Sequence, residues 1–202
     1  MEKRVFLLSP ARAAGERMAL LLNPRAGFAL AQEFQRAGAK LGDLFEFASG
    51  LYFRGKLAYA RAFAQPPHAT AGGLVILPGR GLVDAESLLT MADLMAIAQV
   101  PVDVRDPRYR EPLERDALDL SHKLGKSGAA VLLGSIATGK YADVLSRILG
   151  ERLLFPPDFV GRGDMSRGGL LLRCVRTGTE LPYAPLIGAV RHGPRPPRLP
   201  RF

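Results

Sequence analysis

The stretch VFLLSP at residues 5–10 decides the fold, because four apolar residues run directly into a serine and a proline. A short run that is apolar at every position is typical of a strand with both faces buried. The runs LVIL at residues 74–77 and AAVLL at residues 129–133 have the same character. We therefore predict a sheet that helices cover on both faces.

Helical patterns separate these apolar runs. Serine or asparagine before proline is typical of a helix start, so we expect helices after Ser9-Pro10 and after Asn23-Pro24, the second ending at Gly38. Further helices are expected at residues 57–64, 87–98, 111–124 and 141–149, and after Ser166. Short strands are expected at residues 153–155 and 183–190. The alternation predicts an α/β fold, with residues 1–190 forming a single domain around a mixed, largely covered sheet with helices on both faces.

The composition of the 202 residues is that of a globular protein, with 48% hydrophobic and 23% charged residues. A single cysteine, Cys174, excludes a disulfide scaffold and a cysteine-based zinc site. The three histidines are scattered and form no metal-binding pair. We therefore expect neither a metal nor a cofactor.

Charge is the unusual property of the chain, which carries 28 basic and 19 acidic residues and a formal charge of +9. Residues 161–202 hold eight arginines and only two acidic residues, a local charge of +6. Residues 191–202 form a basic tail, rich in proline and arginine, that can adopt neither a helix nor an inner strand and either lies on the surface or is disordered. This balance indicates an anionic partner, nucleic acid first, although a basic tail can also serve solubility alone.

The apolar runs are too short for a membrane-spanning helix or a secretory signal. We therefore expect a cytoplasmic protein with no membrane partner. The sequence does not indicate an oligomeric state.

Two glycine-rich segments could hold an anion. GSIATGKY at residues 134–141 matches the phosphate-binding pattern GxxxxGK, but Tyr141 replaces the hydroxyl residue that would ligate Mg²⁺. A helix start beside Lys140 still suits a phosphate or a base edge, and the alternative is a tight turn into a helix. GRGDMSRGG at residues 161–169 offers Arg162 and Arg167 to phosphates, with Ser166 as a helix cap. The alternative there is a flexible loop.

Three segments follow predicted strands: Ser9-Pro10, residues 78–81 with Arg80, and residues 134–141. In an open α/β sheet the ligand crevice lies at the carboxyl ends of the strands. If these strands are parallel, the three segments meet at that edge. Their convergence predicts a site better than any one loop does.

The segment LYFRGK at residues 51–56 places two aromatic residues beside two cations. Tyr52 could stack on a base, while Arg54 and Lys56 could contact phosphates. The alternative is that Tyr52 and Phe53 are core residues.

The order of these motifs resembles the peroxide stress protein YaaA family and its broader uncharacterised relatives. The family motif LISPA matches residues 6–11, an LY pair matches residues 51–52, and SGLYGVL matches residues 77–83. EYFKSV is similar to residues 140–144, and ARGLMSR is similar to residues 161–167. The resemblance implies a cytoplasmic α/β protein with a positively charged cleft, DNA binding and a link to oxidative stress. It implies no established reaction.

Three functions are compatible with the sequence. In the first, the protein binds nucleic acid, DNA rather than RNA, with Tyr52 or Tyr141 stacking a base and with phosphate contacts from Arg54, Lys56, Arg80, Lys140, Arg162, Ser166 and Arg167. In the second, it is an enzyme acting on a nucleobase or nucleotide, of glycosidase or base-exchange type, whose candidate catalytic residues are Ser9, Tyr141 and Asp143, with Asp143 as general base. In the third, it is a partner-binding protein whose tail is a docking peptide.

Overall fold

A six-stranded sheet forms the centre of the computed structural model, which describes residues 3–13, 15–197 and 199. The strand order is β4-β3-β1-β6-β7-β8. Four central strands are parallel, namely β1 (Arg4–Leu8), β3 (Gly73–Leu77), β6 (Ala129–Leu133) and β7 (Leu153–Phe155). The edge strands β4 (Gly81–Asp84) and β8 (Ala184–Pro185) run antiparallel to their neighbours. The sheet is mixed, as the sequence predicts, and the three apolar runs form its inner strands.

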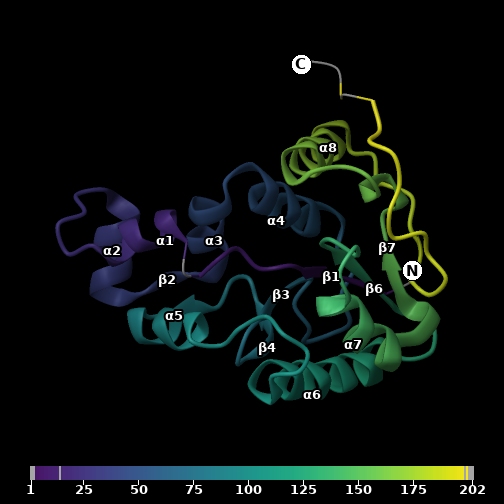
Figure 1. Ribbon diagram of the computed structural model, residues 1–202, viewed down its shortest axis with the longest axis horizontal. Helices are drawn as coiled ribbons and strands as arrows, with labels where there is room; N and C mark the ends of the chain where they lie inside the picture. Colours follow the sequence, from purple (N-terminus) through teal and green to yellow (C-terminus); the bar gives the residue numbers. More distant parts are fainter. Residues whose placement is uncertain (1–2, 14, 198, 200–202) are drawn as a thin grey trace.

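Helices cover both faces of this sheet (Figure 1). The helices α4 (Leu51–Phe63) and α8 (Asp164–Thr177) lie on one face, and α6 (Pro107–Leu124) and α7 (Gly139–Leu149) lie on the other. A lobe at one end contains α1 (Glu16–Leu22), α2 (Ala29–Ala37), α3 (Leu41–Ser49), α5 (Met91–Ala98) and the strand pair β2 (Ala39–Lys40) and β5 (Leu88–Leu89). Two short 3-10 helices, η1 (Gly150–Arg152) and η2 (Pro157–Phe159), flank β7. The predicted α/β architecture is confirmed.

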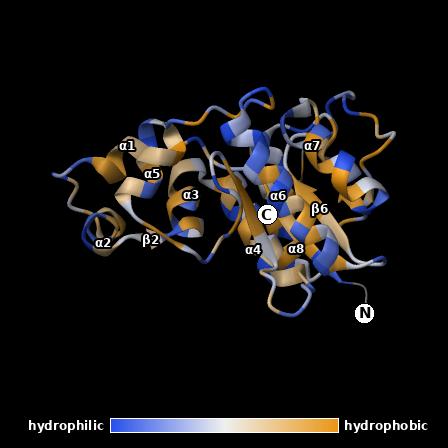
Figure 2. Ribbon diagram, turned by 90° about the horizontal axis from the view of Figure 1, so that it is seen from below, coloured by the Kyte–Doolittle hydropathy of each residue, from blue (hydrophilic) through white to orange (hydrophobic). Residues whose placement is uncertain are grey.

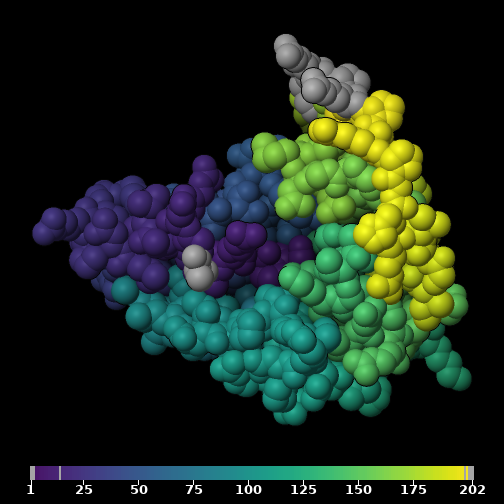
Figure 3. All heavy atoms as spheres, in the orientation of Figure 1, coloured from purple at the N-terminus to yellow at the C-terminus, as the bar shows by residue number. Residues whose placement is uncertain are grey.

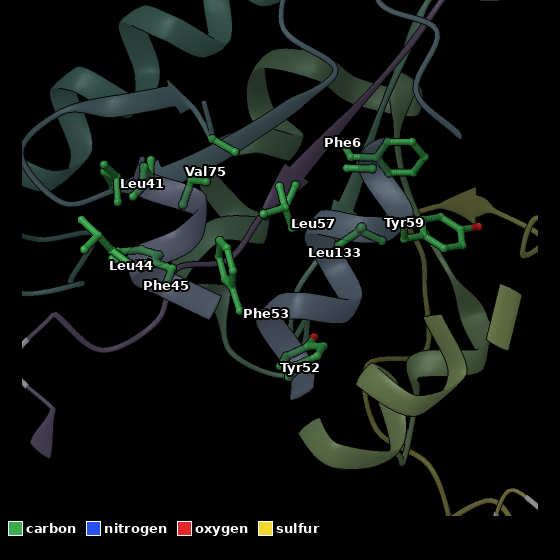
Figure 4. Close-up of a cluster of buried hydrophobic side chains, with 14 of the residues drawn as sticks. Phe6, Leu41, Leu44, Phe45, Tyr52, Phe53, Leu57, Tyr59, Val75 and Leu133 are labelled. Carbon is green, nitrogen blue, oxygen red and sulfur yellow. The ribbon is translucent and has the colours of Figure 1, made fainter. Parts of the chain in front are cut away.

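Two hydrophobic clusters lie on opposite faces of the sheet, because successive strand residues point to opposite sides. On β1, Phe6 and Leu8 join the cluster beneath α4, whereas Val5 and Leu7 join the cluster beneath α6 and α7. Figure 2 shows strand β6 in the orange of hydrophobic residues, and all five of its residues are buried. Figure 4 shows how α4 inserts Tyr52, Phe53, Leu57 and Tyr59 into the first cluster. The core alternative for Tyr52 and Phe53 is therefore correct.

Several helix boundaries differ from those predicted. No helix starts at Ser9-Pro10, because the Ser9 N–H still bonds the Leu133 carbonyl of β6 at 3.2 Å, and α1 begins only at Glu16. Asn23 forms a local turn instead, in which its side chain accepts the Arg25 N–H at 2.9 Å. The helix α2 begins at Ala29 and ends before Gly38, as predicted, where φ is +84°.

Other expected elements change extent for identifiable reasons. Leu88–Leu89 is a strand, because Thr90 and Asp93 form a reciprocal capping box that starts α5 at Met91. Asp106 caps α6 four residues earlier than predicted. Ser166 does not cap α8, which begins at Asp164 after Gly163. The predicted strand at 183–190 is limited to β8, while α3, β2, β4 and an earlier start of α4 were not predicted.

The described part of the tail, residues 191–197 and 199, forms neither helix nor strand, as predicted. It runs along the outside of the molecule past β7 toward α8 (Figure 1). The Arg162 guanidinium donates to the Pro197 carbonyl at 3.4 Å. Arg198 and Arg201, two arginines of the predicted basic tail, lie outside the described residues.

None of the helices in the described ranges combines the length and the apolar character that crossing a membrane requires.

Candidate functional site

A cleft of about 970 Å³ opens at the carboxyl ends of the parallel strands. Ser9 follows β1, Pro78 follows β3 and Ser135 follows β6, and all three line it. In the sheet, β3 lies on one side of β1 and β6 lies on the other. The connection after β1 leads to β3, whereas the connection after β6 leads away from β1 to β7, so the two connections diverge here. Divergence of this kind opens the usual ligand crevice of α/β sheets. The three predicted segments therefore meet, and Figure 3 shows the surface hollowed where the purple N-terminal segment lies between teal and green parts.

Ser9 occupies the inner wall of this cleft and is only 7% exposed. Its position depends on Gly134, the first residue after β6. A Cβ atom on Gly134 would lie 3.0 Å from the Ser9 Cβ and 3.2 Å from Oγ. The glycine thus leaves the space that the serine side chain fills.

Lys56 is buried beside Ser9, with 1% of its surface exposed. Its Nζ lies 2.9 Å from the Ser9 Oγ and 2.5 Å from the Ser9 carbonyl oxygen. The rings of Tyr52 and Phe53 lie 4.4 Å and 5.0 Å from the same nitrogen. Burial lowers the pKa of Lys56 to about 7; Asp164 opposes this fall and Arg167 adds to it. Lys56 therefore holds Ser9 rather than presenting its charge on the surface.

Two tyrosines line the cleft in different settings. Tyr52 is buried against Lys56 and Phe159, with Arg167 close to its hydroxyl. Burial raises the pKa of Tyr52, while the charge of Arg167 opposes the rise. Tyr141 is partly exposed, and burial, with a smaller contribution from Asp164, raises its pKa to about 12. Of the two, Tyr141 is the more exposed and so the more accessible to a ligand ring.

Charged side chains form the outer part of the cleft. Arg12, Arg17 and Lys140 contribute positive charge, and Glu16 and Asp164 contribute negative charge. Lys140 lies in the first turn of α7. The Tyr109 hydroxyl donates a hydrogen bond to the Lys140 carbonyl oxygen at 2.8 Å, and this bond holds the start of the helix in place. The first N–H groups of a helix lack intrahelical partners, so the start of α7 beside Lys140 is suited to an anion.

Other predicted phosphate contacts have structural roles. Arg167 is buried, and its Nε and one NH₂ group donate to the Phe159 carbonyl at 3.1 and 3.0 Å. Arg162 donates to the Asp158 carbonyl at 2.9 Å and to the Ser166 hydroxyl at 3.3 Å. These contacts connect η2, α8 and the tail.

Three further predicted site residues do not line the cleft. Arg54 is exposed on α4. Arg80 pairs with Asp93 at the start of α5. Asp143 faces outward on α7 and accepts from Arg191 at 3.0 Å. Of the predicted residues, the structure brings Ser9, Tyr52, Lys56, Lys140 and Tyr141 together.

A second hollow, of about 670 Å³, lies on the other side of the start of α8. Gly163 lines this groove, whereas the next residue, Asp164, lines the cleft. The arginines that line this groove are Arg162, Arg173, Arg176 and Arg195. Part of the charge concentrated after residue 160 therefore lies in this groove and not in the cleft.

The sequence analysis missed Arg12, Arg17, Ser135 and Asp164 as cleft residues. Asp164 lies within the quoted GRGDMSRGG segment, and Arg12 follows Ser9-Pro10 by two residues, so proximity to a motif was the available signal. Among the described residues, no cluster of three or more histidine, cysteine or acidic side chains could hold a metal. No protein-family model, curated protein or solved structure matches the chain, so its function has to be inferred from the chemistry of the cleft.

Proposed function

We propose that the protein is an enzyme that binds a nucleotide-like phosphate ester in the cleft at the carboxyl ends of its strands. The observation that carries this proposal is that one cleft joins an outer part with three cations and two carboxylates to a buried serine–lysine pair. Its volume of about 970 Å³ falls within the usual range for small-molecule sites. The shape and the charges together suit a mononucleotide.

The phosphate would bind at the start of α7, where Lys140 adds a full charge to the helix N–H groups. The neighbouring Tyr141 is the aromatic surface available to a base. Arg12 and Arg17 would neutralise further phosphate charge from the opposite wall.

Isothermal titration calorimetry with adenosine monophosphate and adenosine tests this proposal. The nucleotide should bind more tightly than the nucleoside, and Lys140→Met should weaken nucleotide binding about 10-fold or more, since one charge-assisted hydrogen bond is lost. Arg54→Met is the matched control, because it removes one exposed cation outside the cleft. Equal binding of nucleotide and nucleoside, or equal affinity in both variants, would contradict the proposal.

Nucleic acid is a second candidate ligand, favoured by the arginine-lined groove that adjoins the cleft at Gly163 and Asp164. A single strand lying in this groove could place its end in the cleft. Affinity for a 20-mer would then fall with salt, and Arg195→Met would reduce the slope of log K against log salt by about one. Arg80→Met is the control, because Arg80 pairs with Asp93 and does not line this groove. Absence of binding at about 50 mM salt would rule out this second function.

A further inference from the structure

The most unusual contact in the cleft joins a hydroxyl to a buried amine. The Ser9 Oγ lies 2.9 Å from the Lys56 Nζ, and both residues line the cavity. A lysine with 1% exposure is rare, because removing an ammonium group from water is costly unless it is well paired. In the part of the chain that the structure describes, its hydrogen bonds are both to Ser9 and neither is to a carboxylate.

The surroundings of Lys56 favour the neutral amine. Facing it are the phenol of Tyr52 on α4, the hydroxyl of Ser9 after β1, and Asp164 and Arg167 on α8. Burial is the main cause that lowers the pKa of Lys56 to about 7. The negative charge of Asp164 raises this pKa, and the positive charge of Arg167 lowers it further. At neutral pH part of the molecules therefore carry a free electron pair on Nζ. The Ser9 carbonyl accepts one amine hydrogen, and this contact can direct the pair toward Oγ.

We propose that Ser9 is a nucleophile and Lys56 its general base, and that together they transfer a phosphoryl group from a phosphate ester bound in the cleft. This inference rests on the proposed function and adds its reaction. The two side chains have the geometry expected of an activated nucleophile, within hydrogen-bond reach of its base.

The step balances as follows. Neutral Lys56 takes the proton from the Ser9 hydroxyl while Oγ attacks phosphorus and a new O–P bond forms. The bond between phosphorus and the ester oxygen breaks, and the leaving oxygen takes the proton from Lys56, which becomes neutral again. Water then attacks the phosphoserine while Lys56 takes one of its protons. The bond between Oγ and phosphorus breaks, phosphate is released, and Oγ takes the proton back from Lys56. No oxidant, reductant or metal enters this sequence.

The cations in the cleft favour a phosphate ester over a carboxylic ester. A phosphoryl group spreads negative charge over three oxygens during transfer, and positive side chains stabilise it. Arg12, Arg17 and Lys140 supply such charges in the same cavity.

A fluorophosphonate probe tests the nucleophile directly, because its phosphorus accepts a serine oxygen and releases fluoride. We expect stoichiometric labelling of Ser9, located by peptide mass spectrometry and absent in Ser9→Ala. Lys56→Met should lower the labelling rate by about 100-fold, the usual contribution of a general base. Ser87→Ala, which removes a hydroxyl outside the cleft, should label as the wild type does.

Two further readouts separate catalysis from a structural role for Lys56. The labelling rate should rise with pH through about 7 and then level off, and this rise should disappear in Lys56→Met. Saturating adenosine monophosphate should slow labelling at least 10-fold, whereas adenosine should slow it less. Circular dichroism establishes that each variant is folded.

Absence of Ser9 labelling in folded wild-type protein, or an equal rate in Lys56→Met, would overturn the inference. Labelling that adenosine monophosphate does not slow would overturn the phosphate ester as substrate. The proposed function fails separately, when calorimetry detects no nucleotide binding. The two failures are distinguishable, because calorimetry on the wild type measures nucleotide binding without the labelling reaction.

Discussion

Gly55 on α4 and Gly168 on α8 are in direct backbone contact. A Cβ atom on Gly55 would meet the Gly168 carbonyl oxygen at 2.7 Å. A Cβ on Gly168 would lie 2.7 Å from the Leu51 carbonyl oxygen and 2.8 Å from the Tyr52 Cα. This crossing brings the first turn of α8, with Asp164 and Arg167, next to Lys56.

Gly168→Ala should lower the free energy of unfolding by about 1–3 kcal/mol, because the added methyl group forces two backbones apart. The loss should occur although alanine is the better helix former by about 1 kcal/mol. Urea denaturation measures it. Gly169→Ala is the matched control on the same helix, since its Cβ would meet only the Leu199 Cδ1 at 3.7 Å. Equal stabilities of the two variants would show that α4 and α8 are not in close contact.

Lys56→Met should change how stability depends on pH. The unfolded chain keeps the Lys56 proton up to its ordinary pKa of 10.5, while the folded protein releases it near pH 7. The unfolded state binds more protons between these values, so the unfolding free energy rises with pH, by at most ~1.4 kcal/mol per unit.

The useful window is pH 7–8.5. Above this window, Cys174 makes the unfolding free energy fall with pH. Burial raises the pKa of the Cys174 thiol, so the unfolded chain loses the thiol proton at a lower pH than the folded protein does. Denaturation curves at several pH values should show the upward slope in the wild type and a flatter one in Lys56→Met. Lys126→Met controls for the loss of one exposed charge. An unchanged slope would mean that Lys56 keeps its proton in the folded state.

Tyr59→Phe should lower stability by about 1–3 kcal/mol, because it leaves a buried donor without a partner. The Tyr59 hydroxyl accepts the Leu181 N–H at 2.8 Å and lies 2.7 Å from the Tyr183 hydroxyl. Tyr183 in turn donates to Glu180 at 2.7 Å. Tyr183→Phe should cost less, since Tyr59 still accepts from Leu181. Thermal unfolding would contradict this order if Tyr183→Phe proved the more damaging.

Thr90→Ala should cost about 1 kcal/mol, the usual value of a helix cap. Thr90 accepts the Asp93 N–H at 3.2 Å, and Asp93 accepts the Thr90 N–H at 2.8 Å. Thr90→Ser keeps the hydroxyl and should recover most of the loss. Thr70→Ala, in an exposed turn, should stay within about 0.5 kcal/mol of the wild type in the same urea titration.

Local patterns in the sequence were sufficient to predict the inner strands of the sheet and the meeting of their loops at its carboxyl edge. Runs such as AAVLL at residues 129–133 are apolar at every position, which is typical of a strand covered on both faces. The convergence of Ser9 and residues 134–141 followed from the parallel direction of their strands. The absence of regular structure at residues 191–197 followed from their proline content.

The roles of individual cations were decided only by the tertiary structure. Arg54 and Lys56 are two residues apart on α4, yet one is exposed and the other buried. Residues two apart on a helix point in different directions, and which direction is covered depends on a neighbour more than 100 residues away. The sequence by itself therefore determined the four parallel inner strands and the edge of the sheet at which their loops meet, but not β2, β4 or β5. The packing of α4 against both β1 and α8 decided that Lys56 is buried and meets Ser9, because burial of a side chain is a property of its packing partners and not of its local sequence.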